Sequence, residues 1–125
     1  MAASDGQGAR EQAEVEERNR WLLALRAHII AADLPVVALA SQSANADEVW
    51  GGIGHGLRAR TLRRRVKDWS KASRYIVLAT GVPWPAALAI FLDFLQDLVE
   101  SAAPPSAIEA TQFALHFMER AGGVP

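Results

Sequence analysis

The sequence lacks cysteine, long hydrophobic runs and a hydrophobic leader. Without cysteine, the chain can form neither disulfides nor a thiolate zinc site, which fits a reducing compartment. The longest apolar run, 86–92, falls far short of the roughly 20 apolar residues that a bilayer requires. Residues 1–8 are small and polar, unlike a signal peptide. We therefore expect a soluble intracellular protein without a membrane partner, and the sequence does not distinguish nucleus from cytoplasm.

Strand patterns, internal repeats and extreme composition are also missing. No stretch alternates apolar and polar residues as a half-buried strand does, and no repeat indicates a solenoid. Hydrophobic residues make up 50% of the 125 residues and charged residues 22%, which excludes wholesale disorder. This length suits one compact domain. The expected fold class is all-α, a small bundle of about four to five helices.

Helix and turn signals divide the chain into four segments. We predict a disordered start over 1–8, an N-terminal helical segment over 9–50, a glycine-rich linker over 51–58 and a helical module over 59–125. Pro35 separates a long front helix from a short apolar one. The linker is defined by Gly51, Gly52, Gly54 and Gly56. The front segment is acidic, whereas the module begins with a cluster of basic residues. The net charge of −1 is therefore the sum of two oppositely charged regions.

Three helices are predicted in the module. They cover 59–79, stopped by Gly81, then 86–102 and 106–122. A capping box, with Ser106 as N-cap and Glu109 three residues later, is expected to open the last helix. The apolar side chains expected to face the core from the last two helices are Leu88, Phe91, Leu92, Leu95, Leu98, Ala110, Phe113, Ala114, Phe117 and Met118.

The helix 59–79 has an apolar face opposite a basic one. Residues 58–74 hold eight of the thirteen basic residues and a single acidic one, Asp68. Like charges one turn apart destabilise an isolated helix, so such a stripe favours a polyanion partner. From Arg60 to Arg74 the stripe spans about 21 Å at 1.5 Å per residue, enough for several phosphates of duplex DNA. The predicted core-facing residues are Leu62, Val66, Trp69, Ser73 and Ile76.

The same charges have an alternative explanation. The stripe can pair with an acidic helix instead, either Glu11 to Glu17 of the same chain, a second copy or a partner, or the acidic face at Asp93, Asp97 and Glu100. A helical protein-interaction or self-association module is therefore the alternative to DNA binding.

The module also carries an ordered series of motifs. These are the run TLRRRVKDW at 61–69, Tyr75, GVPWP at 81–85, a leucine-rich helix over 88–99, a serine-led helix from Ser106, and a terminal Gly-Val-Pro. The series resembles the core-binding (SAM-like) domain of tyrosine recombinases, the phage-integrase family. The resemblance covers 61–125 and does not include the front half of the chain.

This resemblance implies a DNA recombination or integration context. In that family, the helical module clamps one face of duplex DNA while a separate catalytic domain cuts the strand. The resemblance places Thr61, Arg64, Lys67 and Lys71 against the sugar-phosphate backbone. With the rest of the basic stripe, the predicted DNA-binding residues are Arg60, Thr61, Arg63, Arg64, Lys67, Lys71 and Arg74. The family's catalytic residues follow the clamp, and this sequence stops at Pro125 without them.

No constellation in the chain predicts catalysis. The three histidines, His28, His55 and His116, lack a ligand partner one turn away, so no metal site is expected. The glycines of 51–56 follow no strand and precede no Gly-Lys-Ser/Thr, so no nucleotide cofactor is expected. His55 and Arg58 belong to the linker. We predict a non-enzyme without cofactor or small-molecule substrate, whose partner is duplex DNA, with a homo-oligomer or a separate catalytic domain left open.

Overall fold

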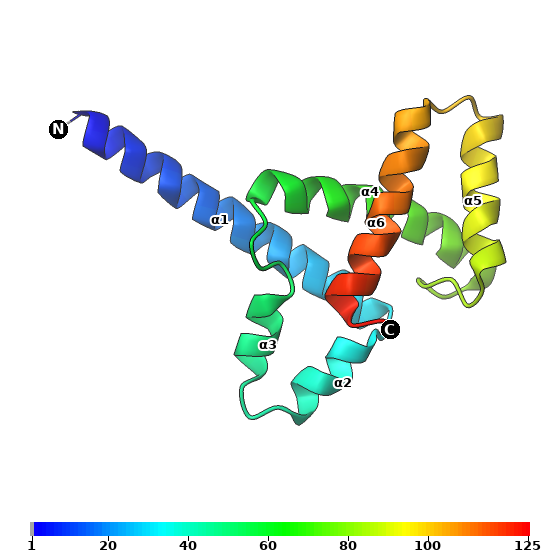
Figure 1. Cartoon of the computed structure of the whole chain (residues 1–125), viewed down its shortest axis with the longest axis horizontal. Coiled ribbons are helices and arrows are strands. Elements are labelled where there is room, and N and C mark those ends of the chain that lie inside the picture. The colour runs from blue at the N-terminus through cyan, green and yellow to red at the C-terminus, as the bar shows by residue number, and fades with distance from the viewer. Residues whose placement is uncertain (1) are drawn as a thin grey trace.

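The computed structural model describes residues 2–125, which form six helices and no strand (Figure 1). The all-α prediction is confirmed for these residues, but the predicted count of four to five is too low. The chain after the first helix breaks at the extended residue Ser43, which gives two short helices. The elements are α1 (Ala2–Ala31), α2 (Pro35–Gln42), α3 (Ala46–Gly52), α4 (Ala59–Thr80), α5 (Leu88–Glu100) and α6 (Pro105–Gly122).

The first helix begins earlier than the sequence suggested. Residues 2–8, expected as a disordered start, continue α1, because adding a residue to an existing helix costs less than nucleating a new one. Gln7 donates from Nε2 to Glu11 Oε1 at 3.4 Å. Figure 1 shows the N-terminal half of α1 projecting beyond the other helices. Val15 lies on this projecting part and remains 52% exposed, although its spacing matches the apolar face of α1.

Helix α4 lies at the centre of the fold and packs against α1, α5 and α6. Its predicted apolar face is confirmed, because Leu62, Val66, Trp69, Ser73 and Ile76 are all buried. The centre of the Trp69 ring lies 5.1 Å from the centre of the Trp84 ring, and Trp84 follows the end of α4. Gly81 ends the helix in the left-handed conformation at φ 82°, as its sequence position predicted.

One hydrophobic core joins the chain on both sides of residues 51–58. Leu25 and Ile29 of α1 and Val36 of α2 belong to the same buried cluster as the apolar face of α4. Gly51 and Gly52 are helical and end α3, so the non-helical connection to α4 is residues 53–58. The acidic front segment and the basic module therefore share a single core.

The last two helices differ from the predicted pattern in four places, because three residues expected to face the core are exposed and Phe94, which was not expected there, is buried. Phe91 and Phe94 of α5 are buried, whereas Leu88 and Leu92 are exposed. Phe113 of α6, expected to point inward, is 49% exposed. Both helices carry more apolar residues than their contacts with α4 and with each other can cover, and periodicity alone does not select among adjacent apolar faces.

The predicted capping box is wrong. Pro104 is the N-cap of α6 and Pro105 its first helical residue, which moves Ser106 inside the helix, and no side chain caps this end. Proline at the first helical position needs no backbone hydrogen bond and has a helical φ, so it begins the helix without a serine.

The end of α6 packs tightly against the turn between α1 and α2. A Cβ atom on Gly122 would collide with Leu34 Cδ1 and come within 2.8 Å of Leu34 Cβ. Gly123 follows in the left-handed conformation at φ 75° and caps the helix. Glycine is therefore required here for the close approach as well as for the cap.

No single helix in the described part of the chain is long and apolar enough to cross a membrane; α1 from Gly6 and α2 pass that test only as a pair, bent by 103°.

Candidate nucleic-acid interface

Polar contacts from α1 hold the beginning of α4 in place. Glu14 Oε2 accepts a hydrogen bond from the backbone N–H of Ala59 at 2.8 Å, which satisfies one of the free donors at the helix start. Arg18 donates to the carbonyl oxygens of Gly54 and Leu57, both at 2.8 Å. These bonds hold the connection before α4 against α1, while burial of the apolar face in the core leaves the opposite face of α4 toward solvent.

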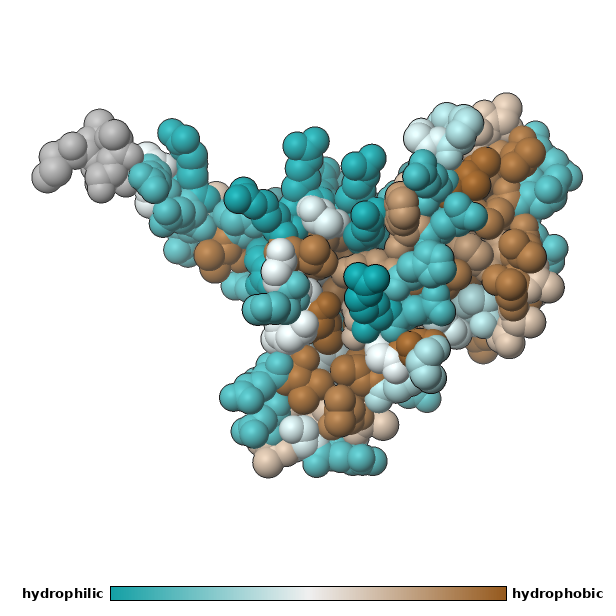
Figure 2. All heavy atoms as spheres, viewed as in Figure 1, coloured by the Kyte–Doolittle hydropathy of each residue, from teal (hydrophilic) through white to brown (hydrophobic). Residues whose placement is uncertain are grey.

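The face of α4 that points outward is the basic one. Arg60, Arg63, Arg64, Lys67, Lys71 and Arg74 are exposed, and Thr61 is half-buried. Figure 2 shows hydrophilic side chains standing along the edge formed by α1 and α4, while hydrophobic residues gather over α5. Among the side chains that the structure describes, the only ion pair closer than 4.0 Å joins His116 to Glu119. The basic stripe is therefore not neutralised by carboxylates at contact distance within the described residues.

Four cations of the stripe surround a shallow hollow of about 450 Å³. These are Arg64, Lys67, Lys71 and Arg74. Asp68, the single carboxylate in the hollow, is half-buried, and its Oδ2 atom is buried without a hydrogen-bond partner. Four exposed positive charges against one partly buried negative charge favour a polyanionic ligand over a neutral one.

The other predicted site residues lie in different surroundings. Arg60 and Arg63 face a pocket between α4 and α1. Thr61 lines a separate groove of about 760 Å³, together with Arg65 and Phe113. Arg65 Cζ lies 5.3 Å from the centre of the Phe113 ring. The structure thus groups six of the seven predicted residues along two adjoining hollows and places Thr61 in the groove beside them.

Trp21 of α1 is a candidate site residue that the sequence did not predict. Lys67 Nζ lies 5.9 Å from the centre of the Trp21 ring, and Arg20 Cζ lies 5.4 Å from it. The indole Nε1 donates to Glu17 Oε2 at 3.2 Å. The contact between Trp21 and Lys67 joins two helices far apart in the sequence, so no local signal could have predicted it.

Within the described residues, no group of three or more histidine, aspartate or glutamate side chains is placed to hold a metal ion. Burial lowers the pKa of His28 on α1, which favours the neutral form of this imidazole.

Comparison of the chain with protein-family models, with curated proteins and with solved structures finds no match in any of the three.

Proposed function

We propose that this protein binds duplex DNA through the exposed cations of α4 and is not itself a catalyst. The observation that carries the proposal is the group of four basic side chains around one hollow, none of them paired with a carboxylate within 4.0 Å among the described residues. Arginine and lysine spread along a helix face contact phosphates more readily than base edges, so binding is mainly electrostatic and weakly sequence-selective.

The length of the cationic group fits a short stretch of one DNA strand. Arg64 to Arg74 spans about 15 Å of helix at 1.5 Å per residue, and each strand places one phosphate about every 3.4 Å along the axis. About four phosphates therefore lie opposite four cations. The motif order in 61–125 favours a recombination or integration context, in which a separate catalytic domain would act on the bound strand.

Salt dependence tests this proposal directly. With about four phosphates neutralised, the slope of log K against log salt is expected to be about −3.6, so that affinity falls about 150-fold between 50 and 200 mM salt. Fluorescence anisotropy on two duplexes of unrelated sequence measures the slope. Equal slopes on both sequences are expected. A slope near zero, or binding confined to one sequence, contradicts the proposal.

Self-association is a second candidate function, favoured by the projecting half of α1 (Figure 1). Glu11 and Glu16 on this part are exposed, and among the described side chains they accept hydrogen bonds only from the neighbouring glutamines Gln7 and Gln12. We propose that these carboxylates can meet the α4 cations of another copy.

Light scattering without DNA tests self-association. We expect oligomers at low salt that dissociate at high salt, because the attraction is screened. The double variant Glu11→Gln and Glu16→Gln should remain monomeric, and the matched variant Gln7→Glu should not. Substitution is preferable to removing the front helix, because Leu25 and Ile29 of that helix are core residues. A wild-type monomer at all salt concentrations rules this candidate out.

A further inference from the structure

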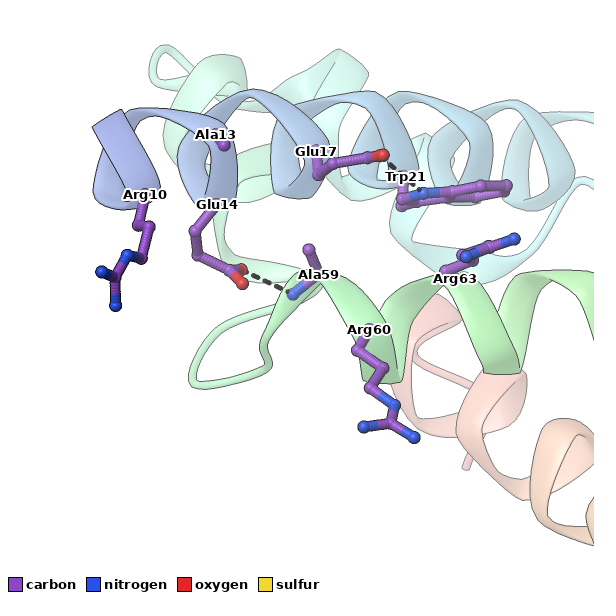
Figure 3. Close-up of a pocket in the computed structure, with 8 residues that line it drawn as sticks. All are labelled: Arg10, Ala13, Glu14, Glu17, Trp21, Ala59, Arg60 and Arg63. Atoms are coloured by element: carbon purple, nitrogen blue, oxygen red, sulfur yellow. Dashed lines mark hydrogen bonds between the residues drawn. The ribbon is translucent and has the colours of Figure 1, made fainter. Parts of the chain in front are cut away.

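Trp21 forms one wall of a pocket between α1 and α4 (Figure 3). The pocket has a volume of about 390 Å³, within the range of about 300 to 1,000 Å³ typical of small-molecule sites. Figure 3 shows Arg63 on the same side of the pocket as the indole of Trp21. The charged residues that line it are Arg10, Glu14, Glu17, Arg60 and Arg63.

The two carboxylates of this pocket already have hydrogen-bond partners. Glu14 accepts from the backbone of Ala59 at 2.8 Å, and Glu17 accepts from the Trp21 indole at 3.2 Å (Figure 3). The guanidinium groups of the three arginines form no ion pair within 4.0 Å among the described side chains. The pocket therefore offers free positive charge beside an aromatic ring, and an anionic ligand with an aromatic part fits both features.

The pocket adjoins the proposed DNA-binding surface. Lys67, which lies 5.9 Å from the centre of the Trp21 ring, also lines the hollow that holds the other α4 cations. A strand whose phosphates contact this hollow thus passes within reach of the indole. An aromatic ring flanked by cations is the arrangement on which unpaired bases stack while their phosphates are held.

We propose that Trp21 stacks an unpaired nucleobase of a DNA strand whose phosphates contact the α4 cations. A base inside a duplex is already stacked on its neighbours and does not reach such a pocket without being extruded. The protein therefore prefers duplexes that carry a single-stranded segment. This inference rests on the proposed DNA binding and adds the kind of DNA that is preferred.

Three DNA ligands distinguish the contribution of base stacking from that of phosphate contacts. They are a blunt duplex, the same duplex with a short thymine overhang, and the same duplex with an abasic overhang that keeps the phosphates and lacks the bases. The full-length protein should bind the thymine overhang at least about fivefold more tightly than the abasic one, since stacking of even one base contributes that much. Fluorescence anisotropy at fixed salt measures the ratio.

Matched tryptophan variants test whether the preference for the thymine overhang depends on Trp21. Trp21→Leu should lower the thymine-to-abasic ratio to about one, while Trp21→Tyr should retain most of it. Trp50→Leu is the control, because Trp50 is also half-buried and lies 4.6 Å from a cation, Arg26, outside this pocket. It should leave the ratio unchanged. Thermal melting followed by circular dichroism establishes that each variant is folded.

The outcomes distinguish this inference from the proposed function. Wild-type protein that binds the duplexes but gives equal affinity for thymine and abasic overhangs overturns the stacking site and leaves duplex binding intact. A ratio that persists in folded Trp21→Leu also overturns it. Failure to bind any of the three ligands at low salt overturns the proposed function itself.

Discussion

Replacing Arg64, Lys67 and Lys71 together by glutamate is expected to weaken duplex DNA binding about 500-fold at 0.1 M salt. Each phosphate contact contributes about 0.9 of a decade of affinity at this concentration through counterion release, so losing three contacts costs about 2.7 decades. The introduced negative charges add repulsion to this loss. The three side chains are exposed, so the helix content measured by circular dichroism should not change.

A charge-preserving variant is the control for this experiment. Arg64→Lys, Lys67→Arg and Lys71→Arg together exchange the type of cation at the same three positions. Because the proposed contacts are to phosphates, this variant should bind within a few-fold of the wild type and keep the same salt slope. If the glutamate variant is folded and loses less than about tenfold in affinity, the α4 cations are not the DNA contact.

Trp69→Ala is expected to lower the free energy of unfolding by about 3–5 kcal/mol. Trp69 is completely buried at the centre of α4 and stacks at a tilt on Trp84, so truncation removes apolar burial and leaves a cavity. A loss of this size is a large part of the roughly 5–15 kcal/mol that stabilises an ordinary domain. Urea denaturation followed by circular dichroism measures it.

Leu78→Ala is the matched control on the same helix. Leu78 is 83% exposed, so its truncation should change the free energy of unfolding by no more than about 0.5 kcal/mol. If Trp69→Ala and Leu78→Ala unfold at the same urea concentration with the same slope, Trp69 is not a core residue and the assigned apolar face of α4 is wrong.

Most features of α4 could be predicted from the sequence because the signals for them are local. The 3.6-residue period of Leu62, Val66, Trp69 and Ile76 predicted the buried face, and Gly81 predicted the end of the helix. The same period placed the basic residues on the opposite face, and their exposure agrees with that placement.

The surroundings of the basic stripe could not be predicted in the same way. The hydrogen bond from Ala59 to Glu14 and the proximity of Lys67 to Trp21 both join α4 to α1, two helices that are far apart in the sequence. Such contacts depend on how α1 and α4 pack, which periodicity does not encode. No local pattern in the sequence indicates that Trp21 lies beside Lys67.

The sequence also could not predict which apolar residues of α5 and α6 are buried. Leu88, Leu92 and Phe113 satisfy a helical apolar pattern and nevertheless lie on the surface, because the neighbouring helices cover only part of each apolar arc.

By itself, the sequence determined that the chain is helical and that α4 has one apolar and one cationic face, since both properties follow from side chains a few residues apart on a single helix. Only the tertiary structure decided that α1 and α4 share one core and that Trp21 lies among the cations of α4. It also decided that the stripe is exposed and forms no close ion pair within the described residues. These features depend on the relative placement of helices, which is set by packing of the whole chain and not by any local segment.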